Sequence, residues 1–131
     1  MTPGRVIVVD DDPDTRSMLR LALESEGHHV IEAQSGIRLV SALHVDRPDL
    51  LLLDAALSWT DGVALCRAVK TNPLYEGLQV VFLSARRTPG DIEAGLAAGA
   101  VDYFPKPVAL GPLLARIDQL LAEGPVAKES P

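Results

Sequence analysis

Short apolar runs alternate with longer amphipathic segments along the chain. Five runs have the length and the β-branched content of strands: 5–9, 29–33, 50–54, 80–84 and 101–104. The first, third and fourth runs are apolar over nearly their whole length, which is typical of strands covered on both faces. The pattern therefore predicts buried strands separated by helices.

The segments after these runs carry apolar residues at helical spacing. The i,i+4 pairs are Met18 with Ala22, Leu19 with Leu23, Leu39 with Leu43, Leu65 with Val69, Ile92 with Leu96, and Leu113 with Ile117. Gly27, Gly99 and Gly124 predict the ends of three of these helices. Strands alternating with helices indicate right-handed βαβ units and a parallel sheet. We therefore expect an α/β fold with a doubly wound five-stranded parallel sheet.

The expected strand order places two acidic segments together. Pro105 cannot donate to a strand ladder, so the last strand is expected at an edge. With the order 2-1-3-4-5, the ligand crevice lies beyond the carboxyl ends of the first and third strands. These strands end at Asp10 and Asp11 and at Asp54, which should converge there, with Ser84 and Lys106 at its border.

Carboxylates gathered in this way need a counter-ion. Two unit charges about 4 Å apart repel by roughly 4 kcal/mol at an effective dielectric near 20. Mg²⁺ suits a few carboxylates with room for water, and it would also neutralise an incoming phosphoryl group while one carboxylate attacks phosphorus. Lys106 and Ser84 would then each bind a phosphoryl oxygen.

Composition narrows the class of protein. The 131 residues fit one domain, expected over residues 1–123, with residues 124–131 a linker or disordered tail. A net charge of −6 argues against nucleic-acid binding by this segment. A single cysteine, Cys66, excludes an internal disulfide and fits a reducing compartment. Neither a membrane span nor a signal-peptide core is visible, so we expect a cytoplasmic protein.

Several motifs together resemble one family, the receiver domains of two-component response regulators. They are VVDDDPDTR, LLLLDAALSWTDG, VVFLSA, AGAVDYFPKPV and LLARI, in family order and close to family spacing. The resemblance implies a flavodoxin-like (βα)5 fold. It also implies a signalling domain rather than an enzyme, although such a domain assists its own aspartyl phosphorylation and dephosphorylation. It implies that Asp54 accepts a phosphoryl group from a phosphohistidine of a histidine kinase or a phosphotransfer protein.

The same resemblance assigns further roles. Asp10 and Asp11 match the acidic Mg²⁺ pair, and Ala56 is expected to add its backbone carbonyl. Ser84 matches the switch hydroxyl, which acts with an aromatic residue and a lysine. Tyr103 matches this aromatic residue, which changes rotamer, and Lys106 matches the lysine, which precedes a candidate cis proline. Phosphorylation would switch the surface of the fourth helix, fifth strand and fifth helix, and so control an output domain or partner.

The chain departs from the family pattern beside the acceptor. Ser58 stands where proline is usual. Ala56 cannot orient an attacking water through its side chain, and Arg86 cannot act as a base. These residues predict slow loss of the phosphoryl group.

The dimer surface of winged-helix regulators is also altered. Asp102 and Arg116 match one of its charged pairs, but Ile92 and Pro112 stand where charged residues are usual. That specific dimer is not expected, although a phosphorylation-dependent homodimer of another kind is left open.

A Ca²⁺-binding site is one alternative to a receiver domain. A Ca²⁺-binding loop would use Asp10, Asp12 and Asp14, but it needs glycine at Thr15 and glutamate at Leu21.

Two alternatives involve the acidic residues differently. A phosphatase of the haloacid dehalogenase kind would use Asp10 as nucleophile, but it needs threonine at Asp14 and usually a larger chain. A non-phosphorylated interaction module would lack the acceptor or the lysine, whereas Asp54 and Lys106 are both present.

Overall fold

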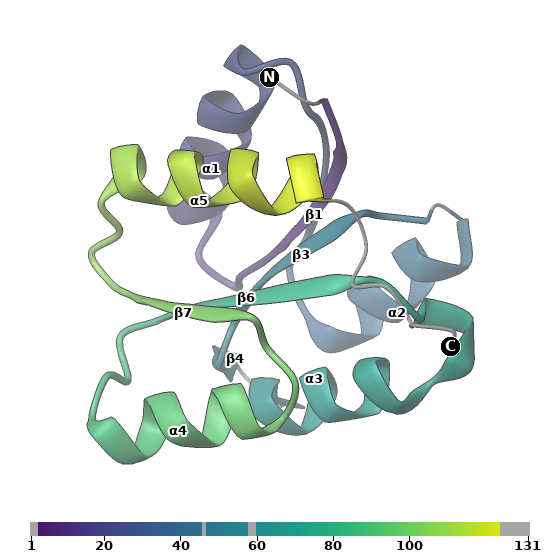
Figure 1. The fold of residues 1–131 in the computed structure, drawn as a ribbon, viewed down its shortest axis with the longest axis vertical. Helices are drawn as coiled ribbons and strands as arrows, with labels where there is room; N and C mark the ends of the chain where they lie inside the picture. The colour runs from purple at the N-terminus through teal and green to yellow at the C-terminus, as the bar shows by residue number, and fades with distance from the viewer. Residues whose placement is uncertain (1–2, 46, 58–59, 124–131) are drawn as a thin grey trace.

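A five-stranded parallel sheet forms the centre of the molecule (Figure 1). The computed structural model describes residues 3–45, 47–57 and 60–123. The strands are β1 (Arg5–Val9), β2 (His29–Ala33), β3 (Leu50–Asp54), β6 (Gln79–Ser84) and β7 (Asp102–Pro105), in the order β2-β1-β3-β6-β7. The expected order and the edge position of the last strand are confirmed.

Helices cover both faces of the sheet (Figure 1). Helices α1 (Pro13–Ser25) and α5 (Leu110–Glu123) pack on one face. Helices α2 (Gly36–Val45), α3 (Gly62–Thr71) and α4 (Pro89–Ala97) pack on the other. Each strand therefore contributes alternate side chains to two separate apolar cores, which explains why the central strands are apolar on both faces.

The polar residues between β1 and α1 begin the helix. Asp12 is the N-cap, its carboxylate accepts from the Asp14 amide at 3.2 Å, and Pro13 follows at the first helical position. Gly27, after the helix, has a φ of 91° that other residues rarely adopt. Both ends of α1 are therefore encoded by local residues.

Some details differ from the sequence prediction. β6 begins one residue before the predicted run and ends at Ser84 as predicted, whereas β7 is shifted by one residue toward the C-terminus. A short antiparallel pair, β4 (Ala56–Leu57) with β5 (Thr60–Asp61), was not predicted. Two-residue strands are too short to show periodicity. The predictions for Ser58 and for the tail 124–131 concern positions outside the described residues.

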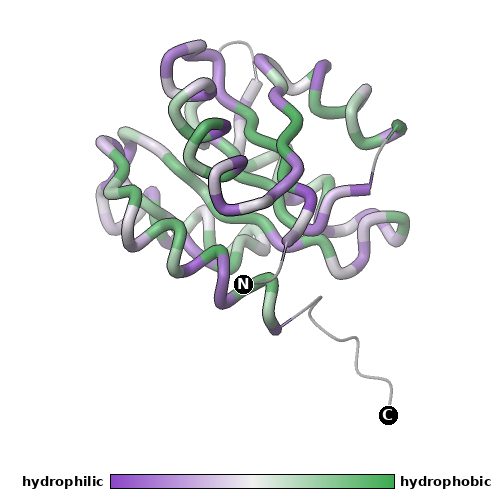
Figure 2. Tube along the Cα trace, turned by 90° about the horizontal axis from the view of Figure 1, so that it is seen from above, coloured by the Kyte–Doolittle hydropathy of each residue, from purple (hydrophilic) through white to green (hydrophobic). Residues whose placement is uncertain are grey.

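Helical spacing of apolar residues also predicts more buried side chains than the structure has. Met18 and Leu96 keep 40% and 44% of their surface exposed, although both belong to the predicted apolar pairs. Figure 2 shows hydrophilic residues interspersed along the outer helices. None of the helices among the described residues is long and apolar enough to cross a membrane.

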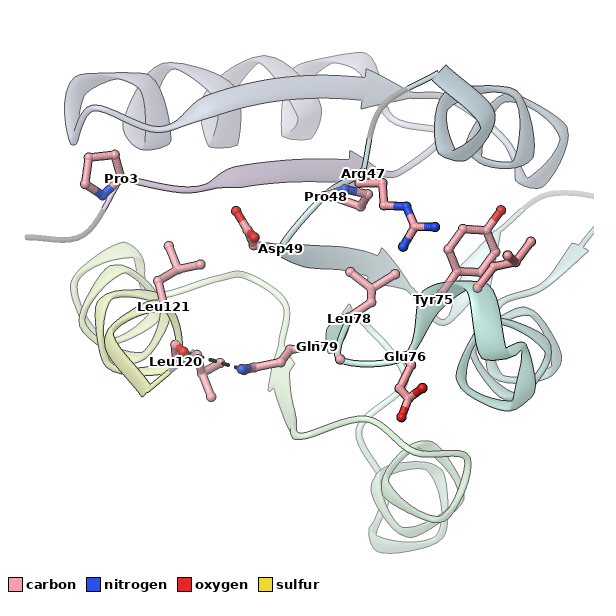
Figure 3. Close-up of a pocket in the computed structure, with 12 residues that line it drawn as sticks. Pro3, Arg47, Pro48, Asp49, Tyr75, Glu76, Leu78, Gln79, Leu120 and Leu121 are labelled. Atoms are coloured by element: carbon pink, nitrogen blue, oxygen red, sulfur yellow. Dashed lines mark hydrogen bonds between the residues drawn. The ribbon is translucent and has the colours of Figure 1, made fainter. Parts of the chain in front are cut away.

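A cavity of about 330 Å³ opens at the end of the sheet where β3 and β6 begin (Figure 3). Leu120 and Leu121, near the end of α5, form one wall, and Tyr75 with Arg47 lies on the opposite side. Gln79 lies between them and donates to the Leu120 carbonyl at 3.4 Å. This cavity is at the amino ends of the strands, away from the acidic residues at their carboxyl ends.

Candidate functional site

Three carboxylates meet at the carboxyl ends of β1 and β3. Asp10, Asp11 and Asp54 each bring one oxygen within 4.8 Å of the others. Asp10 and Asp54 are 1% and 6% exposed, whereas Asp11 is exposed. The structure thus brings together the three acids that the strand order predicted to converge.

Lys106 lies between the two buried carboxylates. Its ammonium nitrogen is 2.6 Å from Asp10 Oδ2 and 3.1 Å from Asp54 Oδ2. The backbone amide of Lys106 donates to the Ser84 carbonyl at 2.9 Å, which fixes the lysine beyond the ends of β6 and β7. The lysine therefore partly neutralises the acidic cluster.

The other oxygen of each buried carboxylate accepts a hydrogen bond from a nearby backbone amide. The Asp12 amide donates to Asp10 Oδ1 at 2.9 Å, and the Ala56 amide donates to Asp54 Oδ1 at 2.9 Å. Both carboxylates thus have the same arrangement, with Oδ1 on the amide two residues later and Oδ2 on Lys106. Their orientation is fixed before any ligand arrives.

Burial and charge shift the pKa values in this cluster. Desolvation raises the pKa of Asp10 above its usual value, although hydrogen bonds from Lys106 and the Asp12 amide oppose the shift. For Lys106, desolvation lowers the pKa, but hydrogen bonding and attraction to Asp10 and Asp54 together outweigh it and raise the pKa. The lysine is therefore held as a cation.

Gly62, the first residue of α3, packs directly against the backbone that carries Asp54. A Cβ on this glycine would lie 2.3 Å from the Asp54 carbonyl oxygen and 2.7 Å from Ala55 Cα. Its amide donates to the Ala55 carbonyl at 3.1 Å. Asp61 before it caps α3 by accepting from the Val63 amide at 2.9 Å. The Asp-Gly pair signalled this turn, but sequence reasoning missed the support it gives to Asp54.

Ser84 and Tyr103 lie on the neighbouring strands β6 and β7. Ser84 is fully buried, and its hydroxyl oxygen accepts from the Arg86 amide at 3.1 Å. The Tyr103 hydroxyl donates to the Arg86 carbonyl, and the ring packs 5.6 Å from the Phe82 ring between centroids. Burial raises the pKa of Tyr103, while a hydrogen bond with Ser84 opposes this. In this structure the tyrosine is packed inside, between β7 and α4.

The structure also describes the candidate cis proline, the Asp102–Arg116 pair and the single cysteine. The Lys106-Pro107 peptide bond is cis. Arg116 pairs with Asp102 within the chain, at 2.8 Å between Nε and Oδ2. Cys66 is buried in the core, and desolvation raises the pKa of its thiol to about 11, which fits a packing role.

The donor set suits Mg²⁺. Three carboxylate oxygens are hard ligands, and the exposed position of Asp11 leaves room for the waters that Mg²⁺ retains. Asp10, Asp11 and Asp54 are the residues that would hold the metal, with the Ala56 carbonyl as a further expected ligand.

Comparison with known proteins agrees with this geometry. The family model of the response regulator receiver domain matches residues 6–118. The response regulator MprA of Mycobacterium sp. (strain KMS) is 40% identical over 119 residues, which are 91% of this chain and 51% of that protein. The chain thus spans about half the length of the curated relatives it matches.

Solved structures show the same fold in two kinds of protein. The signal receiver domain of a signal transduction histidine kinase from Syntrophus aciditrophicus is 30% identical, with a TM-score of 0.84, over 97% of this chain and 95% of that chain. The signal receiver domain of a DNA binding response regulator from Colwellia psychrerythraea 34H is 25% identical, with a TM-score of 0.86, over 90% of this chain and 98% of that chain.

Proposed function

The chain belongs to the response regulator receiver domains, and from this premise we propose that Asp54 is its phosphoacceptor, served by Mg²⁺, Lys106, Ser84 and Tyr103. A receiver domain is a signalling domain of two-component systems. The single observation that carries the proposal is the ammonium of Lys106 bridging Asp10 and Asp54 beside Asp11. Four charged groups from three separate segments converge on one partly exposed surface.

This geometry supports a phosphoryl transfer to Asp54. A carboxylate oxygen of Asp54 attacks phosphorus while the phosphorus–nitrogen bond of the donor phosphohistidine breaks, and the imidazole leaves and takes up a proton. Lys106, already 3.1 Å from Asp54, exchanges this contact for a phosphoryl oxygen. When bound, Mg²⁺ neutralises charge on the transferring group.

Ser84 and Tyr103 would carry the signal away from the site. The buried Ser84 hydroxyl would turn to a phosphoryl oxygen and release its hydrogen bond from the Arg86 amide. The Tyr103 hydroxyl donates to the carbonyl of the same residue, Arg86. Movement of the backbone at Arg86 would therefore change the rotamer that the Tyr103 ring prefers. The ring lies under α4, so the surface of α4, β7 and α5 would respond.

The partners follow from the chemistry. The donor is a histidine kinase or a histidine phosphotransfer protein in the cytoplasm, and the output is a further domain or a partner protein. The family assignment favours this over the phosphatase and interaction-module alternatives. Asp102 and Arg116 pair with each other within one chain. Sedimentation with and without beryllofluoride would test for a phosphorylation-dependent homodimer.

The test uses intact mass after incubation with Mg²⁺ and acetyl phosphate. The wild type should gain one phosphoryl group, and Asp54→Asn should gain none. Asp118→Asn, a substitution on α5, serves as the matched control and should behave as wild type. Full incorporation of the phosphoryl group in Asp54→Asn would contradict the proposal. Hydrolysis of acetyl phosphate that is lost only in Asp10→Asn would also contradict it, because a phosphatase with Asp10 as nucleophile predicts that result.

Binding can be followed separately with the only tryptophan of the chain, Trp59, which lies five positions after Asp54 in the sequence. Its fluorescence should respond to Mg²⁺ and then to beryllofluoride in the wild type. No response in the wild type, or an unchanged beryllofluoride response in Asp54→Asn, would count against the mechanism.

A further inference from the structure

Arg16 reaches from α1 into the backbone of the acidic cluster. Its Nη1 donates to the Asp10 carbonyl oxygen at 2.7 Å, and its Nε donates to Glu32 Oε1 on β2 at 3.1 Å. The side chain is 13% exposed. One guanidinium therefore connects a helix, the end of β1 and the neighbouring strand.

The helix itself does not favour a cation here. The Arg16 amide donates to the carbonyl of the N-cap Asp12 at 3.1 Å, so the residue lies next to the helix N-terminus. The helix dipole makes positive charge unfavourable at that end. The position of Arg16 is instead explained by its two tertiary contacts, with Asp10 and Glu32.

The contact with Asp10 acts on two carboxylates at once. The Asp10 carbonyl belongs to the peptide that joins Asp10 to Asp11, and a planar peptide held at its oxygen cannot rotate freely. The preceding peptide is held as well, because the Asp10 amide donates to the Ala33 carbonyl at 3.1 Å. Arg16 thus completes the anchoring of the segment from which both acidic side chains project.

We propose that Arg16 is a positioning residue that sets the geometry of Asp10 and Asp11 for metal binding. This inference rests on the proposed Mg²⁺ function of the cluster. Arg16 acts through the backbone of Asp10 and contributes its fork of donors, which an ammonium cannot reproduce.

Arg20 provides a matched control on the same helix. It contacts the same acceptor, with Nη1 3.2 Å from Glu32 Oε2, but its Nε bonds Glu24 at 3.0 Å. Arg20→Gln therefore removes an α1 arginine and a Glu32 partner without removing a bond to the Asp10 carbonyl.

The first experiment titrates Mg²⁺ into Arg16→Gln, Arg16→Lys and Arg20→Gln, followed by Trp59 fluorescence. Loss of a group that orients metal ligands typically costs 10–100-fold in affinity, so about a tenfold loss is expected for Arg16→Gln and little change for Arg20→Gln. Arg16→Lys should also lose several-fold. An equal effect of Arg16→Gln and Arg20→Gln, or full affinity in Arg16→Lys, would overturn the proposal.

The second experiment separates this inference from the proposed function, because it needs no metal. The Asp12 amide donates to Asp10 Oδ1, so its NMR resonance reports on the Asp10 carboxylate. In metal-free protein, this resonance and that of the Asp11 amide should shift in both Arg16 variants and stay in place in Arg20→Gln. Unchanged resonances would refute the positioning role, whereas shifted resonances in a protein that fails to bind Mg²⁺ would refute only the metal function.

Discussion

Lys106 and Asp10 are 96 positions apart in the sequence and are joined by a 2.6 Å contact between Nζ and Oδ2. Through Lys106 the domain supplies its own cation to the acidic cluster when no metal is bound. The same ammonium contacts Asp54, so the group that would later bind the phosphoryl oxygen first holds the acceptor in place.

Removal of Lys106 should therefore destabilise the metal-free domain. In Lys106→Met the buried Asp10 and Asp54 lose their shared cation, and we expect a loss of about 2 kcal/mol in the free energy of unfolding, below the range for fully buried pairs because the lysine is 21% exposed. Phosphorylation should be lost as well. Urea unfolding without metal measures the first effect.

A double-mutant cycle checks the cause. Adding Asp10→Asn to Lys106→Met should restore part of the lost stability, because the uncompensated buried charge is removed. Strict additivity of the two substitutions would contradict direct coupling between these residues.

Asp10 should make the stability of the metal-free protein depend on pH. Its pKa is raised in the folded state, mainly by burial, so the folded protein binds the proton more tightly than the unfolded chain. The stability that this group contributes is fully present below the ordinary value of 3.8 and is lost as pH rises through the folded pKa.

The measurement compares wild type with Asp10→Asn in urea at a series of pH values without metal. The wild type should gain stability relative to the variant as pH is lowered through this window. A difference in free energy that stays constant over the window, or that changes in the opposite direction, would show that burial does not control the ionisation of Asp10.

The fold could be predicted from the sequence further than the site could. Strands β1, β2 and β3 have their predicted bounds, because apolar runs flanked by charges are local signals. The convergence of Asp10, Asp11 and Asp54 followed from strand order alone. Anchoring by Arg16 and close packing by Gly62 could not be predicted, because both depend on the distance between segments that the sequence does not specify.

Gly62 should tolerate no side chain. In Gly62→Ala the new Cβ would meet the Asp54 carbonyl at 2.3 Å, so the backbone of β3 or α3 must move. Overpacking of this kind costs about 1–3 kcal/mol, and the displaced Asp54 should also be phosphorylated more slowly. Thermal unfolding and intact mass with acetyl phosphate measure the two effects.

Gly111 is the matched control, since a Cβ there meets no atom within 4 Å among the described residues. Gly111→Ala lies in the first turn of α5 and should leave stability unchanged or raise it by up to about 1 kcal/mol. Equal destabilisation by both substitutions would mean that the contact with Asp54 is not the cause.

The lifetime of phosphorylated Asp54 should be long, with minutes or more for half of the phosphoryl groups to be lost. The Ala56 amide donates to Asp54 Oδ1, so residue 56 lies next to the acceptor, yet its methyl group cannot hold an attacking water. Ala56→Asn adds an amide at this position and should shorten the half-life several-fold. The decay of isolated phosphoprotein in Mg²⁺ measures the rate, and Ala115→Asn, at an exposed position on α5, should leave it unchanged. A half-life of seconds in the wild type would contradict the prediction, since water would then be positioned without the help of residue 56.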